Sequence, residues 1–261
     1  MTDGPLRYWL ERDNQVLRMQ LARPKANIVD AEMIDALSAA LESHITDKRM
    51  MAVMLDAAGP NFSYGASVEE HLPEQCAGML KKLHSLIVQM IAYPVPIAAA
   101  VQGQCLGGGL EVACAASLII AAPDARFGQP EISLAVFAPA ASCLLPERVG
   151  QSQAEMLLLS GQSVDAERAR QIGLIDTVSD EPAEAALAWI GENIIGKSAS
   201  SLRIAVAAAR HDYIARVTEK LQTVEAMYLD ELMRTNDPVE GLNAFLEKRK
   251  PVWENDVTGA D

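Results

Sequence analysis

The sequence predicts an α/β fold. Short apolar runs suited to buried strands alternate with amphipathic helix patterns along most of the 261 residues. Each run leads into a loop that contains Gly or Pro, as in Ala58-Gly59-Pro60. Half of the residues are hydrophobic, which is enough to bury a large core in one domain, with or without an appendage.

The first elements follow from turn and capping signals. Residues 7–11 and 16–21 flank the turn-prone pair Asp13-Asn14 and predict a hairpin. Asp30 then predicts the N-cap of a helix, because apolar residues recur behind it on one helical face. These apolar residues are Met33, Ile34, Leu37 and Leu41.

Three further apolar runs predict buried strands at residues 50–55, 94–101 and 117–122. Beyond about residue 197 the pattern changes, since helix patterns follow one another with no strand between them. These patterns lie at residues 201–210, 217–233 and 239–250. We therefore expect a core of residues 1–195 and a helical assembly region of residues 196–261.

The charge of the chain argues against several classes of partner. A formal net charge of −13 and a pI near 4.8 oppose binding to nucleic acid or to an anionic membrane, because both need a basic surface. Residues 1–8 lack the basic and apolar segments of an export signal, and no apolar run is long enough to span a bilayer. We expect a cytoplasmic protein that acts on a small molecule.

The cysteines and histidines do not have the spacing of metal ligands, so we expect no metal site. Reduced thiols inside the core are expected for all four cysteines, which are Cys76, Cys105, Cys114 and Cys143. Of the four scattered histidines, His71 lies nearest to a candidate site.

Three consecutive glycines, Gly107 to Gly109, end an apolar run and are followed by Glu111. Glycine has no Cβ, so a ligand can approach the peptide N–H groups closely. If a helix begins here, its first amides lack partners within the helix and point at negative charge. An oxyanion site is built in this way. Close packing of a strand on a helix would explain an isolated glycine triplet equally well.

Two more segments accompany the triplet. Residues 61–68 read Asn-Phe-Ser-Tyr-Gly-Ala-Ser-Val, and residues 127–132 read Phe-Gly-Gln-Pro-Glu-Ile. In this order and spacing the three motifs resemble the enoyl-CoA hydratase/isomerase (crotonase) superfamily, and the likeness extends from the hairpin to Trp253. The resemblance implies a spiral of ββα units, an acyl-CoA substrate with no cofactor beyond its coenzyme A, and homotrimers that pair into hexamers.

The resemblance also implies site residues. In the family the thioester oxygen lies between two peptide N–H groups, which correspond to Ala66 and Gly108. The hydratases of the family hold a water between two glutamates, which correspond to Glu111 and Glu131. Glu111 would lie in the first turn of a helix, where the ionised form is favoured, and is the candidate base. Glu131 would lie in a loop among apolar residues, which raise a carboxyl pKa, and is the candidate acid.

The sequence departs from the ordinary hydratase pattern around these motifs. Ser67 replaces the usual acidic residue after Gly-Ala, and residues 136–143 replace a glycine-rich stretch. Within them, Pro139 has no N–H with which to hold a water. The altered segments resemble a branch of the family that hydrates a cyclic dienoyl-CoA by 1,4-addition. On this hypothesis Tyr64 and Phe137 hold the ring flat, and Glu131 delivers a proton across it.

Further contacts to the substrate are implied by the motifs. Lys25 and Ala26 match the loop that lies beside the adenine of coenzyme A in the family. The remaining candidates for binding the substrate are Ser63, Gly65, Val68, Gly107 and Pro130. The basic tail at residues 245–250 matches a helix that reaches the coenzyme A of a neighbouring subunit, although a solvated helix end explains it equally well.

Two alternatives remain open at this point. The first is an ordinary 2-enoyl-CoA hydratase that acts on linear acyl chains. The second is a non-catalytic member of the superfamily that binds RNA or serves as a scaffold, against which the acidic charge and the intact glutamate pair both count.

Overall fold

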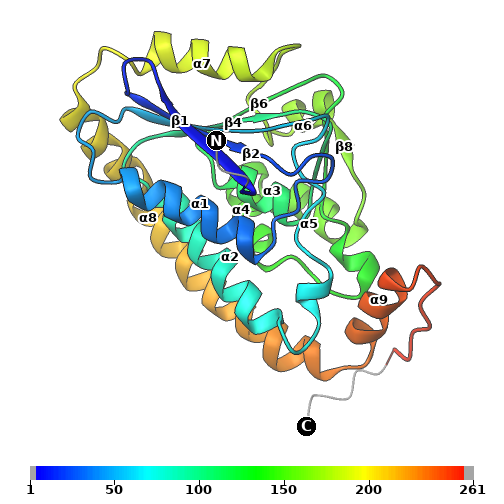
Figure 1. Ribbon diagram of the computed structural model, residues 1–261. Coiled ribbons are helices and arrows are strands. Elements are labelled where there is room, and N and C mark those ends of the chain that lie inside the picture. The colour runs from blue at the N-terminus through cyan, green and yellow to red at the C-terminus, as the bar shows by residue number, and fades with distance from the viewer. Residues whose placement is uncertain (1–3, 256–261) are drawn as a thin grey trace.

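The computed structural model describes residues 4–255, which fold around a larger and a smaller β-sheet (Figure 1). In the larger sheet the strand order is β1-β2-β3-β4-β6-β9. Its strands are β1 (Leu6–Glu11), β2 (Val16–Leu21), β3 (Ala52–Ala57), β4 (Ile97–Val101), β6 (Leu118–Ala121) and β9 (Thr177–Val178). The smaller sheet has the order β5-β7-β8, with β5 (Gln104–Leu106), β7 (Arg126–Gly128) and β8 (Val164–Asp165).

The larger sheet is parallel except for β1, which pairs antiparallel with β2 in the predicted hairpin. Parallel neighbours require crossover connections, and helices supply them. As a result, the carboxyl ends of β2, β3, β4 and β6 lie at one edge of the sheet. The loops that leave this edge carry the three motifs.

Helices cover both faces of the larger sheet (Figure 1). Those described are α1 (Ala31–His44), α2 (Cys76–Ile91), α3 (Gly108–Cys114), α4 (Pro139–Val149), α5 (Gln151–Ser160), α6 (Ala166–Gln171), α7 (Pro182–Asn193), α8 (Ala199–Ala226) and α9 (Asp237–Leu246). Shorter helical turns are η1 (Glu69–His71), η2 (Pro130–Leu134), η3 (Met227–Glu231) and η4 (Leu232–Arg234).

The main core lies between the sheet and the layer formed by α1, α2 and α8, whereas α7 packs on the opposite face. Leu37 of α1 and Leu83 of α2 are buried in this core, and so is Leu221 of α8. Burying such a side chain contributes roughly 1.5–3 kcal/mol. The last helices therefore share the main core with the preceding residues, and the division of the chain near residue 195 stays a prediction.

Several expected elements are confirmed. Asp30 caps α1 by accepting a hydrogen bond from the Met33 amide at 2.9 Å. The three predicted strands form, with β3 shifted two residues toward the C-terminus. The prediction of two separate helices at residues 201–210 and 217–233 was wrong. Because no Gly or Pro interrupts the chain there, α8 continues as one helix of 28 residues.

No helix in residues 4–255 combines the length and the apolar character needed to cross a membrane.

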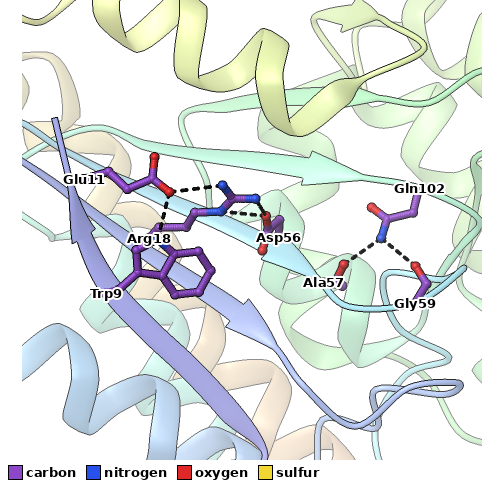
Figure 2. A network of polar contacts seen from close by, with 7 residues as sticks. All are labelled: Trp9, Glu11, Arg18, Asp56, Ala57, Gly59 and Gln102. Carbon is purple, nitrogen blue, oxygen red and sulfur yellow. Dashed lines mark hydrogen bonds and ion pairs between the residues drawn. The ribbon is translucent and has the colours of Figure 1, made fainter. Parts of the chain in front are cut away.

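An ion-pair network links the neighbouring strands β1, β2 and β3 of the larger sheet (Figure 2). Arg18 of β2 donates from Nε to Asp56 of β3 at 2.9 Å, and from Nη1 to Glu11 of β1 at 3.1 Å. The guanidinium lies 5.1 Å from the ring of Trp9, whose indole N–H also donates to Glu11. Burial raises the pKa of Asp56 in spite of the Arg18 charge, so this carboxylate depends on its partner.

We expect Arg18→Met to lower the free energy of unfolding by about 3 kcal/mol, because the substitution leaves the Asp56 charge buried without its partner. Urea unfolding at pH 7 measures the loss. The double variant Arg18→Met/Asp56→Asn also removes the unpaired carboxylate charge, so it should recover at least half of the lost free energy of unfolding. A double variant as unstable as the sum of its single changes would show that the ion pair does not account for the effect.

Candidate active site

The loop after β3 is joined to β5 by its main chain. The Ser63 amide donates to Gln104 O at 2.9 Å, and the Leu106 amide donates to Ser63 O at 3.0 Å. The Ser63 hydroxyl in turn accepts from the Gly65 amide at 3.0 Å. Because Ser63 is fully buried, its role in the described geometry is to shape the loop.

Glycines allow this loop to lie against the start of α3. A Cβ on Gly109 would lie 2.5 Å from Ser63 Cβ, closer than real side chains approach. A Cβ on Gly108 would lie 3.0 Å from the Ala66 nitrogen. Gly65 has a φ of +112°, in the region that favours glycine. The absence of side chains therefore sets the separation of the two segments.

The amides of Ala66 and Gly108 lie close together at this contact. A Cβ on Gly65, the residue before Ala66, would likewise be only 3.6 Å from the Gly108 nitrogen. Within residues 4–255 neither amide donates to another main-chain group. Gly108 is also the first residue of α3, where N–H groups lack partners within the helix. The two amides are thus available to one anionic oxygen.

Glu111 points into the interior from the first turn of α3, as the sequence predicts. Its carboxyl group is 3% exposed and accepts from the Ala141 amide at 2.8 Å. Ala141 lies in the first turn of α4, which begins at Pro139. Burial raises the pKa of Glu111 to about 7, and the amides of Ala141 and Ala140 oppose the rise.

Glu131 lies opposite, in the short turn η2, so its prediction as a loop residue was wrong. Gly107 has a φ of +49°, and a Cβ at this position would collide with Glu131 Oε1. The buried side-chain amide of Gln129 lies against the Glu131 carboxyl group, and with its nitrogen turned toward Glu131 it would donate to the two oxygens at 3.0 and 3.2 Å. Burial and then the charge of Glu111 raise the pKa of Glu131 to about 8.

The two carboxyl groups titrate as a pair. With pKa values raised to about 7 and about 8, the state in which the pair holds one proton is most populated between these values. The Ala141 amide favours the ionised form of Glu111, which makes Glu111 the better candidate for the ionised partner and Glu131 the candidate for the proton.

A cavity of about 350 Å³ adjoins Glu131, whereas Glu111 and Gly108 are not among the residues that line it. Its lining is mostly apolar, with Glu131 and His71 among the polar members. The residues that line it are Tyr64, Gly65, Ala66, Val68, His71, Leu106, Gly107, Pro130, Glu131, Ser133, Leu134, Val136, Leu242 and Phe245.

A second, more open cleft of about 500 Å³ shares Tyr64, Ala66, Val68 and Phe245 with the first. Ala26 and Ser67 line this cleft, together with Arg23. The free amide of Ala66 therefore lies where the two spaces meet.

Some predicted binding residues lie elsewhere. Ser63 is buried beneath the loop, and Lys25 is exposed beside the cleft without lining it. Phe137 packs edge-on against Tyr228, with ring centroids 5.3 Å apart, and is not among the residues that line the cavity. Tyr64 lines both spaces and is 49% exposed.

The sequence analysis missed several contributors. Leu242 and Phe245 of α9 line the cavity of their own chain. Their spacing of three residues places both on one face of this helix. His71 lines it too, and its Nδ1 lies 2.6 Å from Ser67 O. Burial lowers the pKa of His71 in spite of this contact. Gln129 stands two residues before Glu131 within a motif that was already recognised.

Within residues 4–255 no group of three or more His, Cys, Asp or Glu side chains has the geometry of a metal site.

Two free amides beside a buried carboxyl group, Glu111, and a half-buried one, Glu131, form the arrangement expected of an enzyme that stabilises an oxyanion and transfers protons. The family model of enoyl-CoA hydratase/isomerase matches residues 11–256, and the chain belongs to this family.

The chain is 62% identical to the cyclohexa-1,5-dienecarbonyl-CoA hydratase of Thauera aromatica, with 97% of this chain and 98% of the relative covered. It is 30% identical to a probable enoyl-CoA hydratase of Bacillus subtilis, with 94% and 97% covered. The crystal structure of an enoyl-CoA hydratase from Mycobacterium avium subsp. paratuberculosis matches with a TM-score of 0.84 at 24% identity, covering 97% of this chain and 99% of that one. The predicted crotonase fold is confirmed.

The raised carboxyl pKa values predict that stability falls as pH rises. Unfolded glutamates titrate near about 4.3, whereas the folded values are about 7 for Glu111 and about 8 for Glu131. Between these limits the folded state binds more protons, so the free energy of unfolding decreases with rising pH. Glu111→Gln removes one of these groups and also lowers the pKa of Glu131. We expect a flatter dependence for this variant.

Urea unfolding from pH 5 to pH 8 measures this difference, with Glu184→Gln as the control on the exposed start of α7. Equal slopes for the wild type and Glu111→Gln would contradict the raised pKa of Glu111.

Proposed function

We propose that this chain is a hydro-lyase that adds water to cyclohexa-1,5-diene-1-carbonyl-CoA and forms 6-hydroxycyclohex-1-ene-1-carbonyl-CoA. The observation that carries the proposal is the 62% identity with the Thauera aromatica hydratase across nearly all of both chains. The substrate belongs to the anaerobic breakdown of aromatic compounds through benzoyl-CoA. The Glu111–Glu131 pair supplies the acid–base chemistry that hydration needs.

The thioester oxygen lies between the amides of Ala66 and Gly108. Attack of water on the β carbon moves electrons onto this oxygen and forms a dienolate. Backbone donors strengthen as the charge develops, and the loss of one such donor in other enzymes costs roughly 3 kcal/mol. The position of Ala66 where the cleft meets the cavity suits a thioester that joins coenzyme A to an acyl ring.

Water is held between the two carboxyl groups. Glu111, the group with the lower pKa, takes a proton from water as its oxygen bonds to the β carbon. Glu131 gives its proton to the far end of the dienolate, which completes a 1,4-addition. The proton then returns from Glu111 to Glu131 through solvent or product exchange, and the pair is restored.

The apolar cavity suits a six-membered ring. Tyr64 and Val136 lie on its wall, together with Leu242 and Phe245 from α9. A confined flat ring presents both ends of its dienolate to fixed groups, whereas a linear chain gains less from the same walls. Phe137 follows Val136 of this wall, but its own ring packs against Tyr228 and does not line the cavity.

Coenzyme A extends through the second cleft beside Ala26, Ser67 and Val68. The main chain is ordered there, since the Tyr64 amide donates to Ala26 O at 2.9 Å. Lys25 is exposed near this cleft and supplies positive charge to the phosphates. Coenzyme A is part of the substrate, and the reaction needs no separate cofactor.

The working assembly is a homotrimer, and trimers pair into a hexamer. Large apolar side chains without cover support this part of the proposal: Met156 and Leu159 of α5 are 61% and 69% exposed, and Ile204 of α8 is 72% exposed. The enzyme works in the cytoplasm, in keeping with four free buried cysteines.

We expect kcat/KM for the cyclic dienoyl-CoA to exceed that for crotonyl-CoA by at least about 100-fold, because the cavity confines a ring. In D2O, one deuterium should appear on the ring carbon opposite the carbon that receives the hydroxyl group. Mass spectrometry and NMR of the product measure this. Preference for crotonyl-CoA would favour an ordinary 2-enoyl-CoA hydratase, and label on the α carbon would exclude 1,4-addition.

Glu111→Gln and Glu131→Gln should each lower kcat by about 10³-fold, because each removes a proton-transfer group. KM should stay within about threefold, since the amides and the cavity walls that bind the thioester remain. The wild type should show a bell-shaped pH profile with limbs near the carboxyl pKa values of about 7 and about 8. Steady-state kinetics from pH 5 to pH 10 measures both effects. If a variant kept more than a tenth of the wild-type activity, the proposed catalytic role of that carboxyl group would be contradicted.

A further inference from the structure

Tyr228 is a fully buried residue whose hydroxyl group has no hydrogen-bond partner in the described part of the chain. It lies in η3, a π-helical turn that follows directly on the long helix α8. Such turns are rare and occur frequently at functional sites. A buried hydroxyl without a partner costs free energy, so an unpaired hydroxyl in an otherwise close-packed core calls for an explanation.

The surroundings of Tyr228 connect it to both catalytic carboxyl groups. Its ring packs edge-on against Phe137, at 5.3 Å between centroids. Phe137 follows Val136, which lines the acyl cavity and donates from its amide to Glu131 O at 3.3 Å. Two residues after Phe137, α4 begins, and this helix provides the amide bound to Glu111.

The electrostatics point in the same direction. Burial is the main cause that raises the pKa of Tyr228, and the charges of Cys76 from α2, Glu131 from η2 and Glu111 from α3 add to it. The phenol thus stays neutral and keeps its O–H as a donor throughout the pH range in which the carboxyl pair titrates.

We propose that Tyr228 is a positioning residue whose O–H donates to the Glu131 carboxylate after this group has given its proton to the substrate. The inference rests on the proposed function. In the proposed resting state Glu131 carries the proton of the pair and lies beside the Gln129 amide. Transfer of its proton leaves a negative charge in an apolar cavity, where a charge-assisted hydrogen bond is strong. The Glu131 side chain is half-buried, so the proposal requires it to change its rotamer to reach the Tyr228 hydroxyl.

The decisive variant is Tyr228→Phe, with Tyr213→Phe as the matched control. Tyr213 lies on α8, where it lines a separate cavity beside Arg148 and Arg210. We expect Tyr228→Phe to lower kcat at least tenfold with KM changed less than threefold, and the control to stay within twofold of wild type. The thermal midpoint of Tyr228→Phe should equal or exceed that of wild type, because its hydroxyl forms no bond in the resting fold. A structural hydroxyl would give the opposite result, a lower midpoint.

A double-variant cycle identifies the group through which Tyr228 acts. In a Glu131→Gln background the carboxylate cannot form, so adding Tyr228→Phe should change kcat less than twofold. A tenfold loss in that background as well would overturn the proposal. So would a single variant within twofold of wild-type kcat.

A titration without turnover separates this inference from the proposed function. Carbon-13 NMR of glutamate-labelled protein follows the carboxyl pair directly. Loss of a donor to the ionised form should raise the apparent pKa of Glu131 in Tyr228→Phe by about half a unit or more. An unchanged titration would overturn the role of Tyr228 even if the wild type hydrates the cyclic diene. A raised pKa would support it even if the wild type prefers another acyl-CoA.

Discussion

The close approach of the loop after β3 to the start of α3 is the constraint on which the site depends. Ser63 lies where a side chain on Gly109 would have to be, and Ala66 lies where one on Gly108 would be. Any side chain at these positions would push the two free amides apart. The main-chain hydrogen bonds between this loop and β5 keep the loop next to the start of α3. The sheet thus transmits its rigidity to two peptide groups that have no side chains of their own to orient them.

The electrostatics of the site are local. With a net charge of −13, the chain as a whole repels an oxyanion, so short-range dipoles must supply the stabilisation. The start of α3 leaves the Gly108 amide without a main-chain acceptor, and the start of α4 turns the Ala141 amide toward Glu111. Two helix starts thus offer amides to negative charge within one site. Burial raises the pKa of the second carboxyl group, Glu131, which favours its protonated form.

The sequence was most informative where chemistry is tied to local motifs. Gly108, Glu111 and the Asp30 cap could be predicted because each follows from residues a few positions away. Strands of two or three residues in the smaller sheet carry too little pattern to predict, since tertiary packing defines them. The cavity wall from α9 could not be predicted either, because more than a hundred residues separate Phe245 from Glu131 along the chain. Whether the predicted residues bind and catalyse as proposed depends on the experiments described with them.

The division of labour within the site follows from its construction. The two amides come from the loop after β3 and from the start of α3, and the two carboxyl groups come from α3 and η2. The far wall comes from α9, whose Leu242 and Phe245 line the cavity through their side chains. The same helix also approaches the Leu134 carbonyl closely at Gly241, where a Cβ would lie 2.2 Å from the Leu134 oxygen. Side-chain packing tolerates substitution far better than a glycine contact does. A change in Leu242 or Phe245 can therefore alter the shape of the acyl cavity without moving Ala66 or Gly108, so one catalytic arrangement can serve acyl groups of different shape.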